Sequence, residues 1–381
     1  MIFIKNANIV VENGIIPNGE LLIDDKIIVG LGEKDKVCCP YDAKIIDAKG
    51  LYVGPGFVDI HVHGGGDFEF FIEPKKAAEF FLSYGTTTVL PACRNIYDLD
   101  FYLESFKRIR LAMNSGGAGR CIAGVYMEGP FMNPKYGANP EKNLWRGEIK
   151  AERYMPLVDG AGDLVKVWAV APEREGIEPF LQYAKKVNTF VKFAVGHSEA
   201  TPNQISMLEH YGISILTHCM DATGRVSEWE GTRGSGPDEY CFLNDNMYAE
   251  LISDSGGVHV NSDLQKFILK VKGIDKVILI TDCNHVKHSA PKALEKYDDL
   301  SFDPLGRLAG SKLTMNKACK NVIKHTGIDI SKAFLLASSN PARAVGLDNE
   351  IGSIAVGKKA NLVFINDAFD VEKVIFEGEI V

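Results

Sequence analysis

Residues 54–65 read GPGFVDIHVHGG, an apolar run that carries two histidines at its end. Because side chains alternate between the two faces of a strand, this run predicts a buried strand with His61 and His63 on one face. Seven further apolar runs follow, at residues 86–93, 122–130, 165–173, 190–198, 213–220, 247–255 and 276–283. Stretches with helical periodicity lie between several of them, at residues 75–85, 98–113, 177–187, 203–212 and 262–273.

This alternation predicts an α/β fold with eight parallel strands, a (β/α)8 TIM-like barrel. Near-continuous apolar strands are expected in such a fold, because both faces of the sheet are covered. A doubly wound open sheet is the alternative. It would need a GxGxxG phosphate loop after the first strand, and residues 64–70 read GGGDFEF instead. The barrel is therefore the favoured fold.

Short strand-like runs also occupy both ends of the chain. They lie at residues 2–10, 20–32 and 43–50 near the N-terminus and at residues 360–365 and 372–381 near the C-terminus. We expect a small β-sandwich domain built from residues 1–53 and 347–381, and a barrel domain of residues 54–346. Residues 221–246 are rich in glycine and charge, and are expected to form a long loop over the mouth of the barrel.

The composition argues against several classes of protein. The 381 residues carry a net charge of -8, and an acidic protein is a poor general binder of nucleic acid or of an anionic membrane. No run approaches the roughly 20 apolar residues that span a bilayer, and the N-terminus lacks the pattern of a signal peptide. The eight cysteines include no CxxC pair, which is typical of reduced thiols. We therefore expect a cytoplasmic enzyme with neither a membrane nor a nucleic-acid partner.

Metal-type ligands stand at the ends of five of the eight apolar runs, and a histidine follows a sixth. In a barrel enzyme the carboxyl ends of the strands form the active site. The residues concerned are His61 and His63, Glu128, His197, His218, His259 and Asp282. Any one of them could be a capping or core residue, but their recurrence at the same end of strand after strand points to one shared site.

Imidazole and carboxylate ligands without thiolate suit Zn²⁺, Fe²⁺ or Mn²⁺. A bound metal lowers the pKa of its water from 15.7 to about 7 and can polarise a carbonyl oxygen. A neighbouring carboxylate can then accept a proton from the water and deliver it to a leaving amine. Asp282, at the end of the eighth run, is expected to be that carboxylate, and the expected reaction is amide hydrolysis.

Several motifs occur in an order that resembles the N-acetylglucosamine-6-phosphate deacetylases, a branch of the amidohydrolase superfamily. They are GPGFVDIHVHGG, VYMEGPFMNP, VGHSEAT, THCMDA, GVHV, LITD and NPARAVGL…GSIAVGKKANLVFI. The resemblance implies an amidohydrolase-type barrel that deacetylates a phosphorylated amino sugar and works as a homodimer. It also implies one or two divalent metal ions in each subunit.

The resemblance assigns a role to each candidate. The ligands of the main catalytic metal have their counterparts at Glu128, His197 and His218. Those of a second metal, which some members have lost, have theirs at His61 and His63. Asp282 resembles the catalytic acid/base, and His259 resembles the histidine that contacts the substrate and polarises the acetyl carbonyl.

The substrate half of the site departs from the family pattern. Members usually read THxxNAM after the sixth strand, where the Asn-Ala amides hold the sugar phosphate, whereas this chain has Asp221 and Ala222. An aspartate near a phosphate dianion is unfavourable unless a cation lies between them. The family's GAH segment ends here in Asn139, and its phosphate-binding arginine has two candidate matches, Arg225 and Arg233.

Three hypotheses stay open at this point. The first is deacetylation of N-acetylglucosamine 6-phosphate to glucosamine 6-phosphate and acetate. The second is the same chemistry on another N-acetyl amino sugar, either N-acetylgalactosamine 6-phosphate or an unphosphorylated sugar. The third is a non-catalytic protein that keeps the fold as a binding module. The loss of a ligand would favour the third, but every candidate ligand position is filled.

Overall fold

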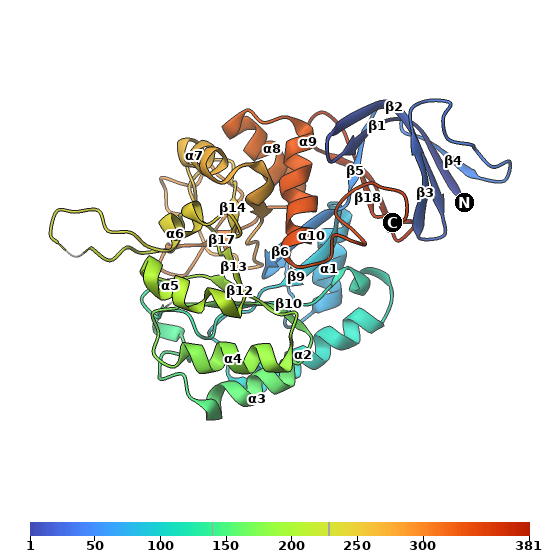
Figure 1. Ribbon diagram of the computed structural model, residues 1–381. Helices are drawn as coiled ribbons and strands as arrows, with labels where there is room; N and C mark the ends of the chain where they lie inside the picture. The colour runs from blue at the N-terminus through green and yellow to red at the C-terminus, as the bar shows by residue number, and fades with distance from the viewer. Residues whose placement is uncertain (139, 228) are drawn as a thin grey trace.

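Each of the eight predicted runs contains a strand. The computed structural model describes residues 1–138, 140–227 and 229–381, and Figure 1 shows their arrangement. In chain order the strands are β6 (Phe57–Val62), β9 (Thr86–Pro91), β10 (Val125–Glu128), β11 (Val165–Val170), β12 (Lys192–Val195), β13 (Ile213–Leu216), β14 (Tyr248–Ile252) and β15 (Val277–Ile280). Every residue of β6, β9, β10 and β15 is buried, as expected for strands that are covered on both faces.

These strands form a curled parallel sheet. Strands β10 to β15 pair in chain order, and β6 pairs with β9 in a separate parallel ladder. A parallel bridge between Ala92 and Tyr126 joins the end of β9 to β10. Just beyond β15, the amide of Asp282 donates to the carbonyl of His61 at 3.0 Å. The carboxyl ends of the first and last strands therefore lie together.

Amphipathic helices cover the outside of the sheet. They are α1 (Pro74–Ser83), α2 (Leu99–Asn114), α3 (Ala151–Ala161), α4 (Ile177–Val187), α5 (Pro202–Leu208), α6 (Pro237–Leu243), α7 (Ser262–Lys272), α8 (Met315–Thr326), α9 (Ile330–Phe334) and α10 (Asn340–Ala344). Helix α4 shows why they form there: it buries Ile177, Phe180, Leu181 and Ala184, which are spaced to make one apolar stripe. Thr201 begins α5 with a capping box to Gln204.

Strands from both ends of the chain form one eight-stranded sheet beside the curled sheet (Figure 1). They are β1 (Ile2–Val11), β2 (Gly14–Asp24), β3 (Ile27–Gly32), β4 (Lys44–Asp47), β5 (Tyr52–Pro55), β18 (Leu362–Ile365), β19 (Val371–Phe376) and β20 (Glu379–Ile380). The antiparallel pairing of β18 with β5 joins the two ends. This sheet has a hydrophobic cluster of its own, which includes Ile9, Leu21 and Val53.

The segment after β13 does not lie over the mouth of the site. Figure 1 shows it as a narrow arm that projects from the body of the molecule before α6 begins. An antiparallel bridge between Val226 and Ser235 closes the arm. Among the described residues of the segment 221–246, only Asp221 and Ala222 line the cavity described below. The expectation of a covering loop was wrong, because its glycines and charges form an exposed hairpin instead.

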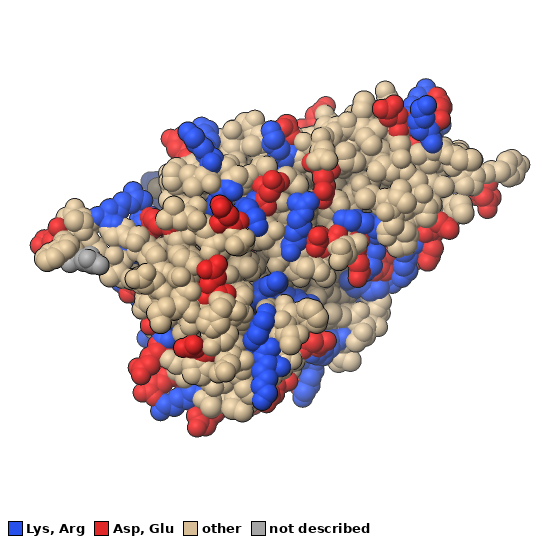
Figure 2. Space-filling view, viewed as in Figure 1, with Lys and Arg blue, Asp and Glu red and all other residues tan. Residues whose placement is uncertain are grey.

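The described helices include none that is both long enough and apolar enough to span a bilayer. On the face of the molecule drawn in Figure 2, basic and acidic side chains are interspersed, and no broad basic surface stands out. A single-sign surface of the kind that binds nucleic acid is therefore missing from this face.

Candidate active site

A cavity of about 390 Å³ opens where the carboxyl ends of the strands converge. Side chains that follow β6, β10, β12, β13 and β15 reach it, and they come from positions more than 200 residues apart along the chain. Those that carry candidate chemistry are His63, Glu128, His197, His218 and Asp282. Five of the seven strand-end residues expected to share a site are thus brought together at one cavity, whereas His61 and His259 are not among the residues that line it.

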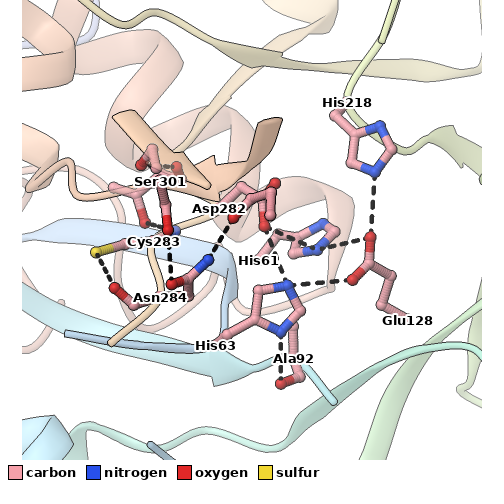
Figure 3. Close-up of polar contacts among 12 residues, drawn as sticks. His61, His63, Ala92, Glu128, His218, Asp282, Cys283, Asn284 and Ser301 are labelled. Atoms are coloured by element: carbon pink, nitrogen blue, oxygen red, sulfur yellow. Dashed lines mark hydrogen bonds and ion pairs between the residues drawn. The ribbon is translucent and has the colours of Figure 1, made fainter. Parts of the chain in front are cut away.

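Glu128 contacts each histidine of this group, and Figure 3 shows its carboxylate between His218 and His63. Its Oε1 atom is 2.8 Å from Nε2 of His197 and 3.1 Å from Nε2 of His218. Its Oε2 atom is 3.1 Å from Nε2 of His63, and Oε1 is 3.5 Å from Nε2 of His61. Burial raises the pKa of Glu128, but the lowering by the His61 ring and the other histidines is larger. The net pKa of Glu128 is therefore well below the usual value. The carboxylate is therefore ionised and faces four imidazoles.

The donor atoms form two overlapping groups that suit a divalent metal. One group is His61, His63 and Glu128, and the other is Glu128, His197 and His218; within each, the ligand atoms lie within 4.8 Å of one another. The Nε2 atoms of His197 and His218 are only 3.1 Å apart, a separation at which a shared cation relieves the repulsion between two lone pairs.

The far nitrogens of two rings are held by backbone carbonyls, which leaves Nε2 of each ring to bind a metal. Nδ1 of His63 lies 3.1 Å from the Ala92 carbonyl, and Nδ1 of His218 lies 3.0 Å from the Asp221 carbonyl. Since a carbonyl can only accept, each Nδ1 carries the proton. The Nε2 atom of His61 is buried and has no hydrogen-bond partner among the described residues. A buried ring nitrogen without a partner fits a metal ligand.

Backbone geometry aims three of these side chains into the cavity. His197, His218 and Asp282 have φ angles of 47°, 27° and 46°, in the left-handed region that residues other than glycine rarely adopt. Each stands one or two residues beyond a strand, where the chain turns sharply away. Strain of this kind is typical of functional sites, and the sequence pattern did not reveal it.

Asp282 is the second carboxylate of the site. Its Oδ1 atom is 3.0 Å from Nε2 of His63 and 3.8 Å from Nε2 of His61. Burial raises the pKa of Asp282, but the contact with His63 and the charge of His61 outweigh burial, so the net pKa is lowered. Its backbone is fixed on both sides, since its carbonyl also accepts from the amide of Ser311 at 2.8 Å. An ionised and firmly placed carboxylate can accept a proton at neutral pH.

His259 is held by a buried aspartate that the sequence analysis did not single out. Nδ1 of His259 is 3.0 Å from Oδ2 of Asp254. Burial lowers the pKa of His259, while Asp254 and then Asp221 raise it, with a net increase. Conversely, burial raises the pKa of Asp254 and its bond to His259 lowers it, to about 2. The Nε2 atom of His259 is buried and has no hydrogen-bond partner within the described part of the chain.

The expected substrate contacts divide into two groups. Asp221 and Ala222 line the cavity, whereas Asn139 lies outside the described residues. Neither arginine of the arm lines the cavity within the chain. Arg225 donates from Nε to Oε1 of Glu239 at 2.7 Å, and Arg233 lies 3.7 Å from the same oxygen. A contact between either arginine and substrate across a dimer stays a prediction.

Three other basic residues line the cavity and were missed from the sequence. They are Arg94, Lys142 and His288. Arg94 stands three residues beyond β9, so the strand-end rule that found the histidines could have found it. Lys142 and His288 belong to long connections, for which the sequence pattern carries no comparable signal.

Comparisons with known proteins agree with this geometry. The profile described as "Amidohydrolase family" matches residues 52–381. An N-acetylglucosamine-6-phosphate deacetylase of Bacillus subtilis is 29% identical over 100% of this chain and 96% of its own length. An N-acetylgalactosamine-6-phosphate deacetylase of Escherichia coli O157:H7 is 26% identical over 99% and 98%. The crystal structure of N-acetylglucosamine-6-phosphate deacetylase from Pasteurella multocida superposes with a TM-score of 0.85 at 27% identity, covering 100% of this chain and 99% of that one.

Proposed function

The chain belongs to the amidohydrolase family, and from that premise we propose that it is a metal-dependent deacetylase of N-acetylglucosamine 6-phosphate. The products are acetate and glucosamine 6-phosphate. The observation that carries the proposal is the cluster of Glu128, the four imidazoles around it and Asp282, all of which except His61 line a single cavity. The relatives named for this activity support the substrate.

One or two divalent ions, of Zn²⁺, Fe²⁺ or Mn²⁺, belong to this proposal. Glu128, His197 and His218 would hold the main ion, and His61 and His63 would hold a second ion together with Glu128. When bound, such an ion supplies Lewis acidity, which polarises the acetyl carbonyl and makes water a nucleophile at neutral pH.

The proton steps fall to residues of the chain. Asp282 accepts a proton from the attacking water, because it is ionised and lies against His63. It then delivers that proton to the amide nitrogen, which leaves as an amine. His259 is held by Asp254 so that its Nε2–H donates to the acetyl oxygen as negative charge develops there.

The phosphate end of the substrate requires cations. Within the chain, Arg94 and Lys142 line the cavity, while Arg225 is engaged with Glu239. Arg94 makes no ion pair with any other described residue, so its guanidinium can meet phosphate oxygens in a bidentate fork. We therefore assign the phosphate contact to Arg94 and Lys142 and keep the arm arginines for a role across a dimer.

N-acetylgalactosamine 6-phosphate is the alternative substrate, because one of the similar relatives carries that name over almost the whole chain. The two sugars differ only in the configuration at one ring carbon. Asp221 stands where the family usually has asparagine, so this chain contacts the sugar differently from most members of the family. Comparison of kcat/KM for the two epimers decides between them.

The architecture belongs to the same proposal. The curled sheet is interpreted as a closed (β/α)8 barrel of residues 54–346, with a small β domain from residues 1–53 and 347–381. The bonds between β15 and β6, and the sheet shared by both ends, support this division. We also propose that the protein is a cytoplasmic homodimer. The family resemblance supports the dimer, and the eight free thiols support the cytoplasmic location.

The decisive experiment couples metal analysis to an acetate-release assay. The purified protein is tested on four sugars: N-acetylglucosamine and N-acetylgalactosamine, each with and without a 6-phosphate. The proposal expects bound divalent metal and the highest kcat/KM on N-acetylglucosamine 6-phosphate. Acetate release from none of the four by metal-loaded protein would instead favour a non-catalytic binding role.

A further inference from the structure

Glu250 is a fully buried carboxylate that the proposed chemistry does not use. It lies on β14, where its side chain is 0% exposed, and it does not line the cavity. Its Oε2 atom is 3.1 Å from Nδ1 of His61, and the same atom accepts from the backbone amide of His218 at 3.2 Å. One carboxylate oxygen thus contacts a residue from each of the two candidate metal groups.

The contact with His61 fixes the tautomer of that ring. Oε2 of Glu250 accepts from the His218 amide and so acts as an acceptor, which requires Nδ1 of His61 to carry the proton. Nε2 is then left with its lone pair directed towards Glu128, whose Oε1 atom is 3.5 Å away. Without Glu250, His61 could adopt the other tautomer and donate from Nε2 to Glu128 or Asp282, which would remove it as a metal ligand.

The charge of Glu250 favours the same interpretation. A buried carboxylate destabilises the fold unless a cation or hydrogen bonds compensate it. Among the described residues, Glu250 forms an ion pair only with His61, and its Oε1 atom has no hydrogen-bond partner. A cation on the far side of the His61 ring would supply the missing positive charge through the imidazole. Ligand histidines commonly pair with a carboxylate in this way.

Building on the proposed function, we propose that Glu250 is the positioning residue for a second metal ion held by His61, His63 and Glu128. It acts through His61 and touches neither substrate nor metal. Its contact with His218 reaches only the backbone amide, whereas the His218 ring is held by the Asp221 carbonyl. Loss of the carboxylate therefore weakens the His61–His63 position and spares the ion at His197 and His218.

The test uses the full-length Glu250→Gln protein, which keeps the shape of the side chain and removes its charge. Zn²⁺ binding is measured by equilibrium dialysis against metal buffers, with metal and protein quantified separately. The wild type should bind two ions, and the variant should bind the second ion 10- to 100-fold more weakly while retaining the first. Asp299→Asn is the matched control, because Asp299 is also buried but contacts Ser255 rather than a candidate ligand.

Nitrogen-15 NMR of the histidine rings provides a measurement that does not depend on the variant's folding. The wild type should show His61 as the Nδ1–H tautomer. The Nε2–H tautomer, a single ion in the metal-saturated wild type, or an unchanged second-site affinity in Glu250→Gln would each overturn the inference. A wild type that deacetylates with one ion would contradict this inference but leave the proposed function intact; one that binds no metal would contradict both.

Discussion

Replacement of Asp282 by asparagine separates proton transfer from metal binding. The substitution keeps the size of the side chain, but the amide cannot accept and return a proton. Oδ1 of Asp282 lies 3.0 Å from Nε2 of His63, whereas Glu128 contacts all four candidate ligand histidines. We therefore expect Asp282→Asn to retain metal, and Glu128→Gln to lose it.

The magnitude follows from the role assigned to Asp282. General acid–base catalysis contributes about 10²- to 10⁴-fold, or roughly 2.7 to 5.5 kcal/mol of activation free energy. Because the proton moves only in the transition state, kcat and kcat/KM should fall by the same factor. The second carboxylate that contacts His63, that of Glu128, remains in place and keeps the site assembled.

The assay is steady-state acetate release on N-acetylglucosamine 6-phosphate, with metal content measured on the same samples. Asp303→Asn is the control, since Asp303 lines the same cavity but is paired with Arg307 at 2.6 Å. Its kcat should stay close to that of the wild type. If Asp282→Asn lost its metal while Glu128→Gln kept it, the two roles would be reversed; a near-normal kcat in metal-loaded Asp282→Asn would refute the proton-transfer role.

Three further predictions concern metal, phosphate and pH. Chelation should abolish activity, and Zn²⁺, Fe²⁺ or Mn²⁺ should restore it; full turnover by protein shown to be metal-free would contradict the metal requirement. Arg94→Ala should lower kcat/KM about 10-fold or more, some 1.4 kcal/mol, on the phosphorylated sugar alone. Arg225→Ala and Arg233→Ala should cause the same loss only if the arm reaches a partner subunit. Equal losses on the phosphorylated and unphosphorylated sugars would exclude a phosphate contact. The pKa of Asp254 is lowered from 3.8 to about 2, so its bond to His259 should stabilise the fold above pH 3.8, and this stabilisation should be lost as the pH falls towards 2. The melting temperature of Asp254→Asn should therefore depend less on pH between these values than that of the wild type. An identical pH dependence in the two proteins would contradict the role of this bond.

The fold was predictable where one local signal repeated. The strands of the curled sheet are short and largely apolar, and helical periodicity is visible in the sequence between several of them. What joins the first strand to the last was not predictable. Asp59, fully buried on β6, accepts from the hydroxyl and the amide of Thr281 beyond β15, more than 200 residues away. No local pattern encodes a contact of that separation.

The same limit applies to the site. Residues at strand ends were found by a positional rule, and the structure brings five of the seven together at one cavity. Glu250 was missed because it lies within the apolar run YAELI, although a carboxylate in such a run is as costly as that of Glu128 and could have been flagged on the same ground. Lys142 was missed because its place at the cavity depends on how a long connection after β10 folds back.

Asp221 explains why the substrate half of the site cannot simply follow the family pattern. Its carbonyl holds the ring of His218, so its backbone is fixed at the edge of the metal group. Its side chain lines the cavity and adds negative charge to a space that Glu128 and Asp282 already share. A phosphate dianion placed against Asp221 would be repelled at close range. Arg94, which enters from the end of β9, offers the opposite charge in the same cavity. A phosphorylated sugar bound with its acetyl group at Glu128 should therefore turn its phosphate away from Asp221 and towards Arg94.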